Sequence, residues 1–184
     1  MAGDRILVTG AAGFAGSHLL DLLSSPSNDG DDSIVRTKAT EPPTIVAWCR
    51  PGGQKPRTLP GVEWRAVDLL DRQGVVDALD GARPGIVYHC AGAAHVGRSW
   101  QTTSTTYRVN VLATHLLLDA LRRTGLKARI VITGSAAVYA PSDAAMDEAH
   151  RLAPSSPYAV SKLAQELVAL DGTASGDVVV ARSF

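Results

Sequence analysis

Three glycines, spaced three residues apart directly after the first apolar run of the chain, constrain the fold more than any other feature. The run Arg5–Thr9 is short and apolar, as expected of a buried strand, and the glycine spacing is G-x-x-G-x-x-G. Glycine has no Cβ, so the backbone can turn tightly between a strand and a helix and lie close to a ligand. The helix that follows would present free N–H groups and a positive dipole end to a phosphate group. This arrangement favours dinucleotide binding, and the residues expected at the pyrophosphate are Gly10, Gly13, Phe14, Ala15 and Gly16.

Short apolar runs alternate with longer helical patterns along the whole chain. Strands are expected at 5–9, 44–49, 62–67, 85–91, 128–133 and 177–181, and helices at 14–23, 71–79, about 104–123 and from residue 157. Strands that are apolar almost throughout are typical of a parallel sheet covered by helices on both faces. Right-handed crossovers leave few topologies, so the predicted fold class is α/β with a doubly wound parallel sheet of the Rossmann type.

Length and composition indicate one domain with a substantial core. The chain has 184 residues, a formal net charge of zero and 45% hydrophobic residues. We therefore expect residues 1–184 to form a single dinucleotide-binding domain. The stretch 24–43 is rich in Ser, Asp, Pro and Gly and is expected to be a flexible surface loop.

The same composition argues against several functional classes. There is no basic excess to bind nucleic acid, and no apolar stretch is as long as a membrane span. The first residues lead straight into a strand, without the pattern of a secretory signal. Cys49 and Cys90 lack the spacing of metal ligands and are expected to be small core residues, so no metal site is predicted. The expected location is the reducing cytoplasm.

The residue after the second expected strand bears on the choice of dinucleotide. An acidic residue at that position usually binds the 2′-hydroxyl of the adenosine ribose, and this chain has Arg50 there instead. A guanidinium favours a 2′-phosphate, which it can hold through paired hydrogen bonds. The sequence therefore favours NADP over NAD, while the alternative that Arg50 is a solvated loop residue stays open.

A tyrosine and a lysine four residues apart lie at the start of the last expected helix. Ser156 can cap this helix, and Pro157 suits its first position. Residues i and i+4 share a helix face, so Lys162 is expected beside Tyr158. A nearby ammonium favours a phenolate and so brings a tyrosine closer to acting as an acid or base at neutral pH. For these two residues alone, a plain surface pair is the alternative.

Taken together, the ordered motifs resemble the extended short-chain dehydrogenase/reductase family of NAD(P)-dependent sugar-nucleotide epimerases, dehydratases and reductases. The resemblance covers nearly the whole chain, with Ala113, Gly134 and Ala140 as departures from the family's pattern. The matching segments are 9–16 (T-G-x-x-G-F-x-G), 68–69 (an acidic and an apolar residue), 89–94 (H-x-A-A), 110–114 (N-V-x-G-T), 134–140 (S-S-x-x-V-Y-G) and 158–162 (Y-x-x-x-K).

The resemblance implies roles for individual residues. Ser135 and Tyr158 would hydrogen-bond the reacting oxygen of the substrate, and Tyr158 would exchange a proton with it. Lys162 would stabilise the phenolate and hydrogen-bond the nicotinamide ribose, while the nicotinamide would carry the hydride. The further cofactor contacts that the resemblance implies are Asp68 and Leu69 at the adenine, and Ala91, Gly92 and Ala93 along the dinucleotide.

Details of the resemblance favour one reaction. Sugar dehydratases of this family place acidic residues directly after the catalytic hydroxyl, where this chain has Ala136 and Ala137, so dehydration is disfavoured. The segment 94–100, with Ser99 as an expected substrate contact, resembles the branch that acts on GDP-mannose-derived sugars. With Arg50, it favours reduction of a 4-keto-6-deoxy sugar nucleotide, as in GDP-6-deoxy-mannose reductases. A sugar-nucleotide 4-epimerase, which would retain NAD without net consumption, is the alternative.

Two expectations concern the whole molecule. In the family the chain continues past residue 184 into a smaller domain that holds the sugar nucleotide. The resemblance therefore also leaves open a dinucleotide-binding module without turnover. The helices at 104–123 and from 157 carry long apolar stripes and pair across a two-fold axis in the family, which implies a homodimer. The alternative is that both stripes face only the sheet.

Overall fold

The computed structural model places six strands in one parallel sheet, in the order β3-β2-β1-β4-β5-β6. It describes residues 5–25, 43–53, 58–171 and 177–184, so most of the loop expected at 24–43 lies outside the described residues. The strands are β1 (Arg5–Thr9), β2 (Thr44–Cys49), β3 (Val62–Ala66), β4 (Ile86–His89), β5 (Arg129–Thr133) and β6 (Val178–Ala181). This strand order is that of a doubly wound nucleotide-binding sheet, and it confirms the predicted fold class.

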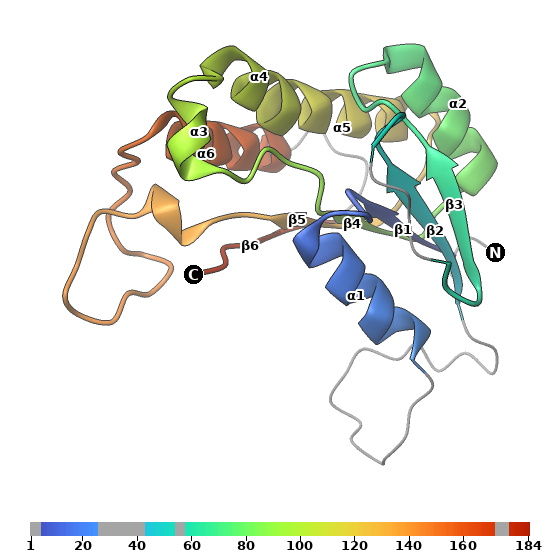
Figure 1. Ribbon diagram of the computed structural model, residues 1–184, viewed down its shortest axis with the longest axis horizontal. Coiled ribbons are helices and arrows are strands. Elements are labelled where there is room, and N and C mark those ends of the chain that lie inside the picture. The colour runs from blue at the N-terminus through green and yellow to red at the C-terminus, as the bar shows by residue number, and fades with distance from the viewer. Residues whose placement is uncertain (1–4, 26–42, 54–57, 172–176) are drawn as a thin grey trace.

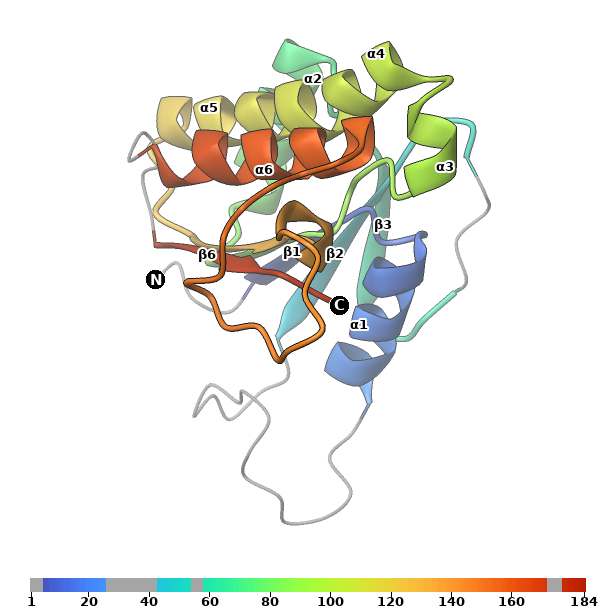
Figure 2. The same cartoon turned by 90° about the vertical axis from the view of Figure 1, so that its left-hand side faces the viewer.

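Helices cover both faces of the sheet (Figure 1). One face carries α1, and the other carries α2, α5 and α6, of which α5 and α6 lie side by side in Figure 2. The longer helices are α1 (Phe14–Ser24), α2 (Arg72–Ala82), α5 (Ala113–Arg123) and α6 (Pro157–Leu170), and the short ones are α3 (Val96–Ser99), α4 (Thr103–Tyr107) and the 3-10 turn η2 (Ala136–Val138). No helix in the described part of the chain is long and apolar enough to cross a membrane.

The central strand β1 is buried on both faces because successive side chains point to opposite sides of a sheet. Leu7 packs into the apolar cluster under α2 and α5, where Leu117 is also buried. Val8 packs into a second cluster together with Leu20 of α1. The carboxyl end of β1 is therefore fixed from both sides, and this end leads directly into the glycine turn.

The long helix expected at 104–123 is interrupted. A π-helical turn, η1 (Arg108–Leu112), separates α4 from α5. A π turn contains one more residue than an α turn and often marks a functional position. Here it contains Asn110, whose side chain is fully buried. The prediction of one continuous α-helix was wrong because this turn depends on contacts that Asn110 makes elsewhere in the fold.

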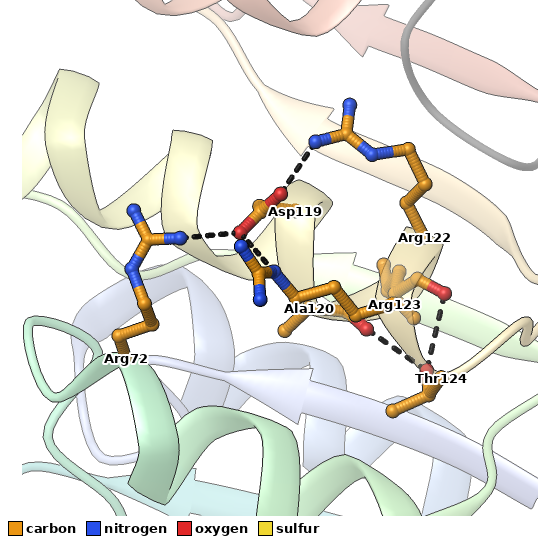
Figure 3. Close-up of polar contacts among 7 residues, drawn as sticks. Arg72, Asp119, Ala120, Arg122, Arg123 and Thr124 are labelled. Atoms are coloured by element: carbon orange, nitrogen blue, oxygen red, sulfur yellow. Dashed lines mark hydrogen bonds and ion pairs between the residues drawn. The ribbon is translucent and has the colours of Figure 1, made fainter.

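A buried carboxylate surrounded by arginines joins α2 to α5 (Figure 3). Asp119 of α5 accepts a hydrogen bond at 2.7 Å from Arg72 of α2, and further ones from Arg122 and Arg123 of its own helix. The bond from Arg123 is the largest cause that holds the pKa of Asp119 below its usual range. The cluster therefore stabilises the packing of the two helices mainly while Asp119 is ionised.

Candidate active site

The glycine turn is packed so closely that two of its glycines leave no room for a side chain. Gly10 has a φ of +64°, and a Cβ there would lie 2.5 Å from the backbone nitrogen of Ala91. A Cβ on Gly16 would lie 2.4 Å from the carbonyl oxygen of Gly10. The cap residue of α1 is Gly13, which has no side chain to cover the first N–H groups of the helix. The turn therefore offers a bare helix N-terminus, which suits the pyrophosphate of a dinucleotide.

The other residues predicted to contact the cofactor lie along the same edge of the sheet. Arg50 is exposed directly after β2, and 91–93 follow β4. After β3, Asp68 is exposed and its carboxylate accepts a hydrogen bond at 2.9 Å from the backbone of Leu70, while Leu69 is half-buried against the core. The carboxyl ends of parallel strands meet at one edge, which is where ligands bind in sheets of this kind. The residues present therefore fit a dinucleotide.

Lys162 points from α6 into the protein and is only 4% exposed. Its Nζ donates to the carbonyl oxygen of Thr133, at the end of β5, and to Oε1 of Gln165 at 2.5 Å. Burial lowers the pKa of Lys162 to about 8, while the nearby Glu166 opposes this shift. At neutral pH this lysine is still a cation, but its pKa is much closer to neutral pH than that of a surface lysine.

Tyr158 is half-buried at the start of α6, where two serines hold the backbone. Ser156 caps the helix by accepting a hydrogen bond from Ala159, as the sequence predicted. The backbone nitrogen of Tyr158 donates to Oγ of Ser99 at 3.1 Å. Within the described ranges the Tyr158 hydroxyl has no hydrogen-bond partner, so it is available to a substrate.

Ser99 and Ser135 are both buried, and both hydroxyls contact the backbone. Oγ of Ser99 donates to the carbonyl of Val96 at 2.5 Å in addition to accepting from Tyr158. The structure thus places Ser99 beneath the start of α6, and its contact with substrate stays a prediction. Ser135 follows β5 and caps η2, accepting from the nitrogen of Ala137 at 3.2 Å. Its hydroxyl hydrogen remains free for a substrate oxygen.

Asn110 joins the segment after β4 to the helix that carries Tyr158. Its Oδ1 accepts from the nitrogen of Ala93 at 2.7 Å, and its Nδ2 donates to Oγ of Ser161 at 2.9 Å. The Ser161 hydroxyl in turn donates to the carbonyl of Tyr158 at 2.7 Å. The π turn is therefore tied to both the expected cofactor segment and the tyrosine.

A second buried network joins α6, β6 and the segment after β5. Glu166 is 1% exposed and pairs with Arg182 at 2.8 Å. Arg182 also donates to the hydroxyl of Tyr139 at 2.7 Å, and its pKa is raised, mainly by the hydrogen bonds to Glu166. Neither Glu166 nor Arg182 was predicted from the sequence as a site residue. Their signal in the sequence was a charged residue at an otherwise buried helix position and another at the end of an apolar strand.

The strand order, the glycine turn and the Ser135, Tyr158 and Lys162 motifs at one edge define an extended short-chain dehydrogenase/reductase. The sequence model for GDP-mannose 4,6 dehydratase matches residues 7–181. The chain therefore belongs to the GDP-mannose 4,6-dehydratase family, whose relatives are NAD-dependent epimerases and dehydratases.

Curated relatives include both dehydratases and epimerases. A dTDP-glucose 4,6-dehydratase of an Actinoplanes species is 36% identical over 97% of this chain and 55% of its own length. A UDP-glucose 4-epimerase of Rhizobium leguminosarum bv. trifolii is 30% identical over 100% of this chain and 52% of its own length. The chain spans about half the length of the curated relatives it matches.

Several solved structures of similar proteins are complexes with NAD. The UDP-glucose 4-epimerase from Brucella ovis in complex with NAD has a TM-score of 0.83 and 28% identity, over 99% of this chain and 52% of that one. MoeE5 in complex with UDP-glucose and NAD has a TM-score of 0.75 and 33% identity, over 97% of this chain and 53% of that one.

Proposed function

We propose that this protein binds a nicotinamide dinucleotide at the glycine turn and reduces a 4-keto-6-deoxy sugar nucleotide. The main support for this proposal is the free hydroxyl of Tyr158, four residues from the buried Lys162. Both lie at the sheet edge that also holds the bare N-terminus of α1. Family membership supports the classes of cofactor and substrate. The chain spans about half the length of these relatives, and the proposal includes turnover by this chain itself.

Three residues of this chain would have separate roles in the reduction of a carbonyl group. Tyr158 donates its proton to the carbonyl oxygen, and Ser135 donates a hydrogen bond to the same oxygen as negative charge develops on it. The ammonium of Lys162 stabilises the phenolate that Tyr158 leaves behind. When bound, the nicotinamide supplies the hydride.

Two alanines favour reduction over dehydration. Removal of water from a sugar needs an acid and a base near the carbon chain, in addition to the hydride chemistry. In η2, directly after Ser135, this chain has the methyl groups of Ala136 and Ala137 in the two places where the family's dehydratases have acidic residues. We infer that the chain differs in this respect from the dehydratases to which it is similar.

Arg50 supports NADP as the dinucleotide. It is exposed at the end of β2, where a guanidinium can meet a 2′-phosphate and where an acidic residue would repel it. The similar structures contain NAD, so NAD is the alternative. Competition calorimetry with the two dinucleotides decides between them, and Arg50→Asp should reverse a preference for NADP.

A 4-epimerase is the second candidate function. The observation that favours it is the similarity to UDP-glucose 4-epimerases in both sequence and structure. An epimerase returns the hydride to the same sugar, so it retains NAD and shows no net oxidation of NADPH.

The direct test measures NADPH oxidation by the purified protein with 4-keto-6-deoxy sugar nucleotides. Tyr158→Phe should lower the rate by at least about a hundred-fold, which is the usual size of a general-acid contribution. Tyr88→Phe, which changes a half-buried tyrosine of β4, is the matched control. An unchanged rate in Tyr158→Phe contradicts the proposal, and dinucleotide binding without turnover supports a binding module.

We also propose a homodimer formed through the helical segment 104–123 and α6. Large apolar side chains of η1 and α6 are exposed to solvent in the single chain. They are Leu112 (42%), Val160 (38%), Leu167 (64%) and Leu170 (57%). Exposed large apolar side chains on neighbouring helices are typical of an interface between subunits.

A further inference from the structure

Behind the proposed active site, buried polar side chains form one continuous chain of hydrogen bonds. Nζ of Lys162 donates to Oε1 of Gln165 at 2.5 Å, and Nε2 of Gln165 donates to Oγ1 of Thr114 at 2.8 Å. Oγ1 of Thr114 lies 2.9 Å from Nε2 of His89, whose Nδ1 lies 2.7 Å from Oγ1 of Thr9. Four of these residues are fully buried, and Lys162 is 4% exposed. The chain runs from α6 through α5 and β4 to the last residue of β1, directly before the glycine turn.

Lys162 sets the direction of the first hydrogen bonds. An ammonium has only hydrogens to give, so the Gln165 amide presents its oxygen to Lys162 and its NH2 group to Thr114. The Thr114 hydroxyl gives its single hydrogen to the carbonyl of Asn110, 2.7 Å away. Its oxygen is then an acceptor for Gln165 and has one lone pair left for His89.

The neutral ring of His89 sets the direction of the remaining hydrogen bonds. Burial above all, and Lys162 in addition, lower the pKa of His89 to about 3. The ring then carries its one hydrogen on Nε2, toward Thr114, and Nδ1 accepts from the hydroxyl of Thr9. With these assignments, each polar side-chain atom of these five hydrogen-bonded residues has a partner. Reversing the Gln165 amide would place its NH2 group against the ammonium of Lys162.

We propose that Gln165 is the positioning residue for Lys162, holding the ammonium in place relative to the glycine turn. This inference rests on the proposed function, in which Lys162 stabilises the phenolate of Tyr158. A lysine side chain is long and flexible, so an ammonium without fixed acceptors would sample several positions. Gln165 and the Thr133 carbonyl accept two of its three hydrogens, and the third remains for the phenolate or the cofactor.

A neutral amide suits this role because the surroundings of Lys162 already carry charge. Glu166 of α6 is near the ammonium and is paired with Arg182 at the end of β6, while His89 of β4 and Cys90 directly after it are also near. Burial raises the pKa of the Cys90 thiol to about 11, so His89 and Cys90 are both uncharged at neutral pH. Gln165 therefore restrains the ammonium without adding a charge that would strongly change its titration.

The test follows Lys162 directly, by NMR of its Nζ in protein labelled with ¹⁵N-lysine. The chain has four lysines, Lys38, Lys55, Lys127 and Lys162, so the spectrum is simple, and Lys162→Arg assigns the signal. The wild-type midpoint is expected near pH 8. Gln165→Met removes an acceptor and should move the midpoint to lower pH, whereas Gln165→Glu supplies a carboxylate and should move it higher.

Controls separate positioning from general damage. Gln73→Met, on the exposed side of α2, makes the same substitution elsewhere and should leave the Lys162 midpoint unchanged. If Gln165→Met does not fold, Gln165→Glu decides alone because it keeps the acceptor. A Lys162 midpoint in Gln165→Glu equal to that of the wild type overturns the proposal.

The turnover rate of the Gln165 variants is the second measurement, and it distinguishes the role of Gln165 from the proposed function. In an active protein, Gln165→Met should lower kcat by roughly ten- to a hundred-fold through misplacement of the ammonium, and Gln165→Glu should restore part of it. If the wild type turns over no sugar nucleotide, the proposed function fails while the NMR titration still decides the role of Gln165.

Discussion

Burial shifts the pKa of three side chains that lie close together in this protein. It lowers the pKa of His89 to about 3 and that of Lys162 to about 8, and it raises that of Cys90 to about 11. Each shift favours the uncharged form, as expected when solvent is removed from an ionisable group. The stability of the fold should therefore depend on pH through these residues.

Acid should destabilise the protein through His89. The unfolded ring titrates near 6.5 and the folded one at about 3, so between these values the unfolded state binds more protons. Stability is then lost as the pH falls through this window, with a contribution of at most about 1.4 kcal/mol per pH unit. Urea unfolding at several pH values should show a smaller slope for His89→Gln than for the wild type.

The exposed His115 of α5 provides the comparison for this measurement. His115→Gln changes the same residue type on the surface and should keep the wild-type slope. Equal slopes for the wild type and His89→Gln would rule out a role for the buried ring in acid stability.

Gly10→Ala should lower the stability of the fold by more than the left-handed backbone conformation of Gly10 alone would. Gly10 and Gly125 have nearly equal φ values of +64° and +66°, but a Cβ on Gly125 would meet nothing within 4 Å. Gly125→Ala should cost about 1–2 kcal/mol for the left-handed conformation. Gly10→Ala adds a collision with Ala91 and should cost clearly more and abolish dinucleotide binding, as measured by urea unfolding and calorimetry.

Only part of the candidate site could be predicted from single residues. The spacing of Tyr158 and Lys162 is local, so helix geometry alone predicts that they share a face. The surroundings of Lys162 depend on how α6 packs against α5 and β5, because β5 brings the Thr133 carbonyl to Lys162 and α5 brings Thr114 to its partner Gln165. A glutamine in an apolar helix stripe indicates a buried partner but does not say which one.

At the scale of elements, the regular strands were predicted well and the irregular turns were not. The bounds of β1 and β2 agree with the expected ranges 5–9 and 44–49 because both strands are short, apolar and followed by turn residues. The strand expected at 85–91 ends at His89, and neither α3 nor the π turn was predicted. These irregular segments are fixed by distant hydrogen bonds, such as that of Asn110 with Ser161.

The arginine cluster should contribute to the packing of α2 on α5. Asp119→Asn removes the charge that three arginines share and leaves them to repel one another, which should cost about 1–3 kcal/mol. Asp80→Asn, which affects an exposed pair with Arg83 at 3.8 Å, should cost less than about 1 kcal/mol.

Urea unfolding at low and high salt measures both variants. Salt should weaken the wild-type advantage over Asp119→Asn because the arginines are about half exposed. Identical stabilities of Asp119→Asn and Asp80→Asn would show that the cluster does not fasten the two helices.

At the scale of the whole molecule, alternation of strands and helices was enough to predict the parallel sheet, because crossover connections are restricted in handedness. The sequence also predicted the family, since its motifs occur in a fixed order along the chain. The apolar stripes of α5 and α6 did not settle the oligomeric state, because an apolar residue on a helix can face either the sheet or a second subunit.

The proposed dimer can be tested with one substitution. Leu167 is 64% exposed on α6, so Leu167→Glu should cost the single chain little and should prevent association. Leu22→Glu, at a 52% exposed position of α1 on the opposite face of the sheet, is the control and should leave the dimer intact. Light scattering at micromolar concentration that finds a monomeric wild type contradicts the proposal.

The position of β1 in the sheet has a consequence for synthesis on the ribosome. β1 precedes the other five described strands along the sequence, yet it pairs with β4 on one side, and Thr9 meets His89 across 80 positions of sequence. A nascent chain can pair β1 with β2 early, but the opposite edge of β1 has no hydrogen-bonding partner until β4 has emerged. Gln165 must emerge later still before Lys162 has its anchor. Dinucleotide binding should thus be acquired only after Gln165 has emerged, and until β4 pairs with it the open edge of β1 is exposed to aggregation and to chaperones.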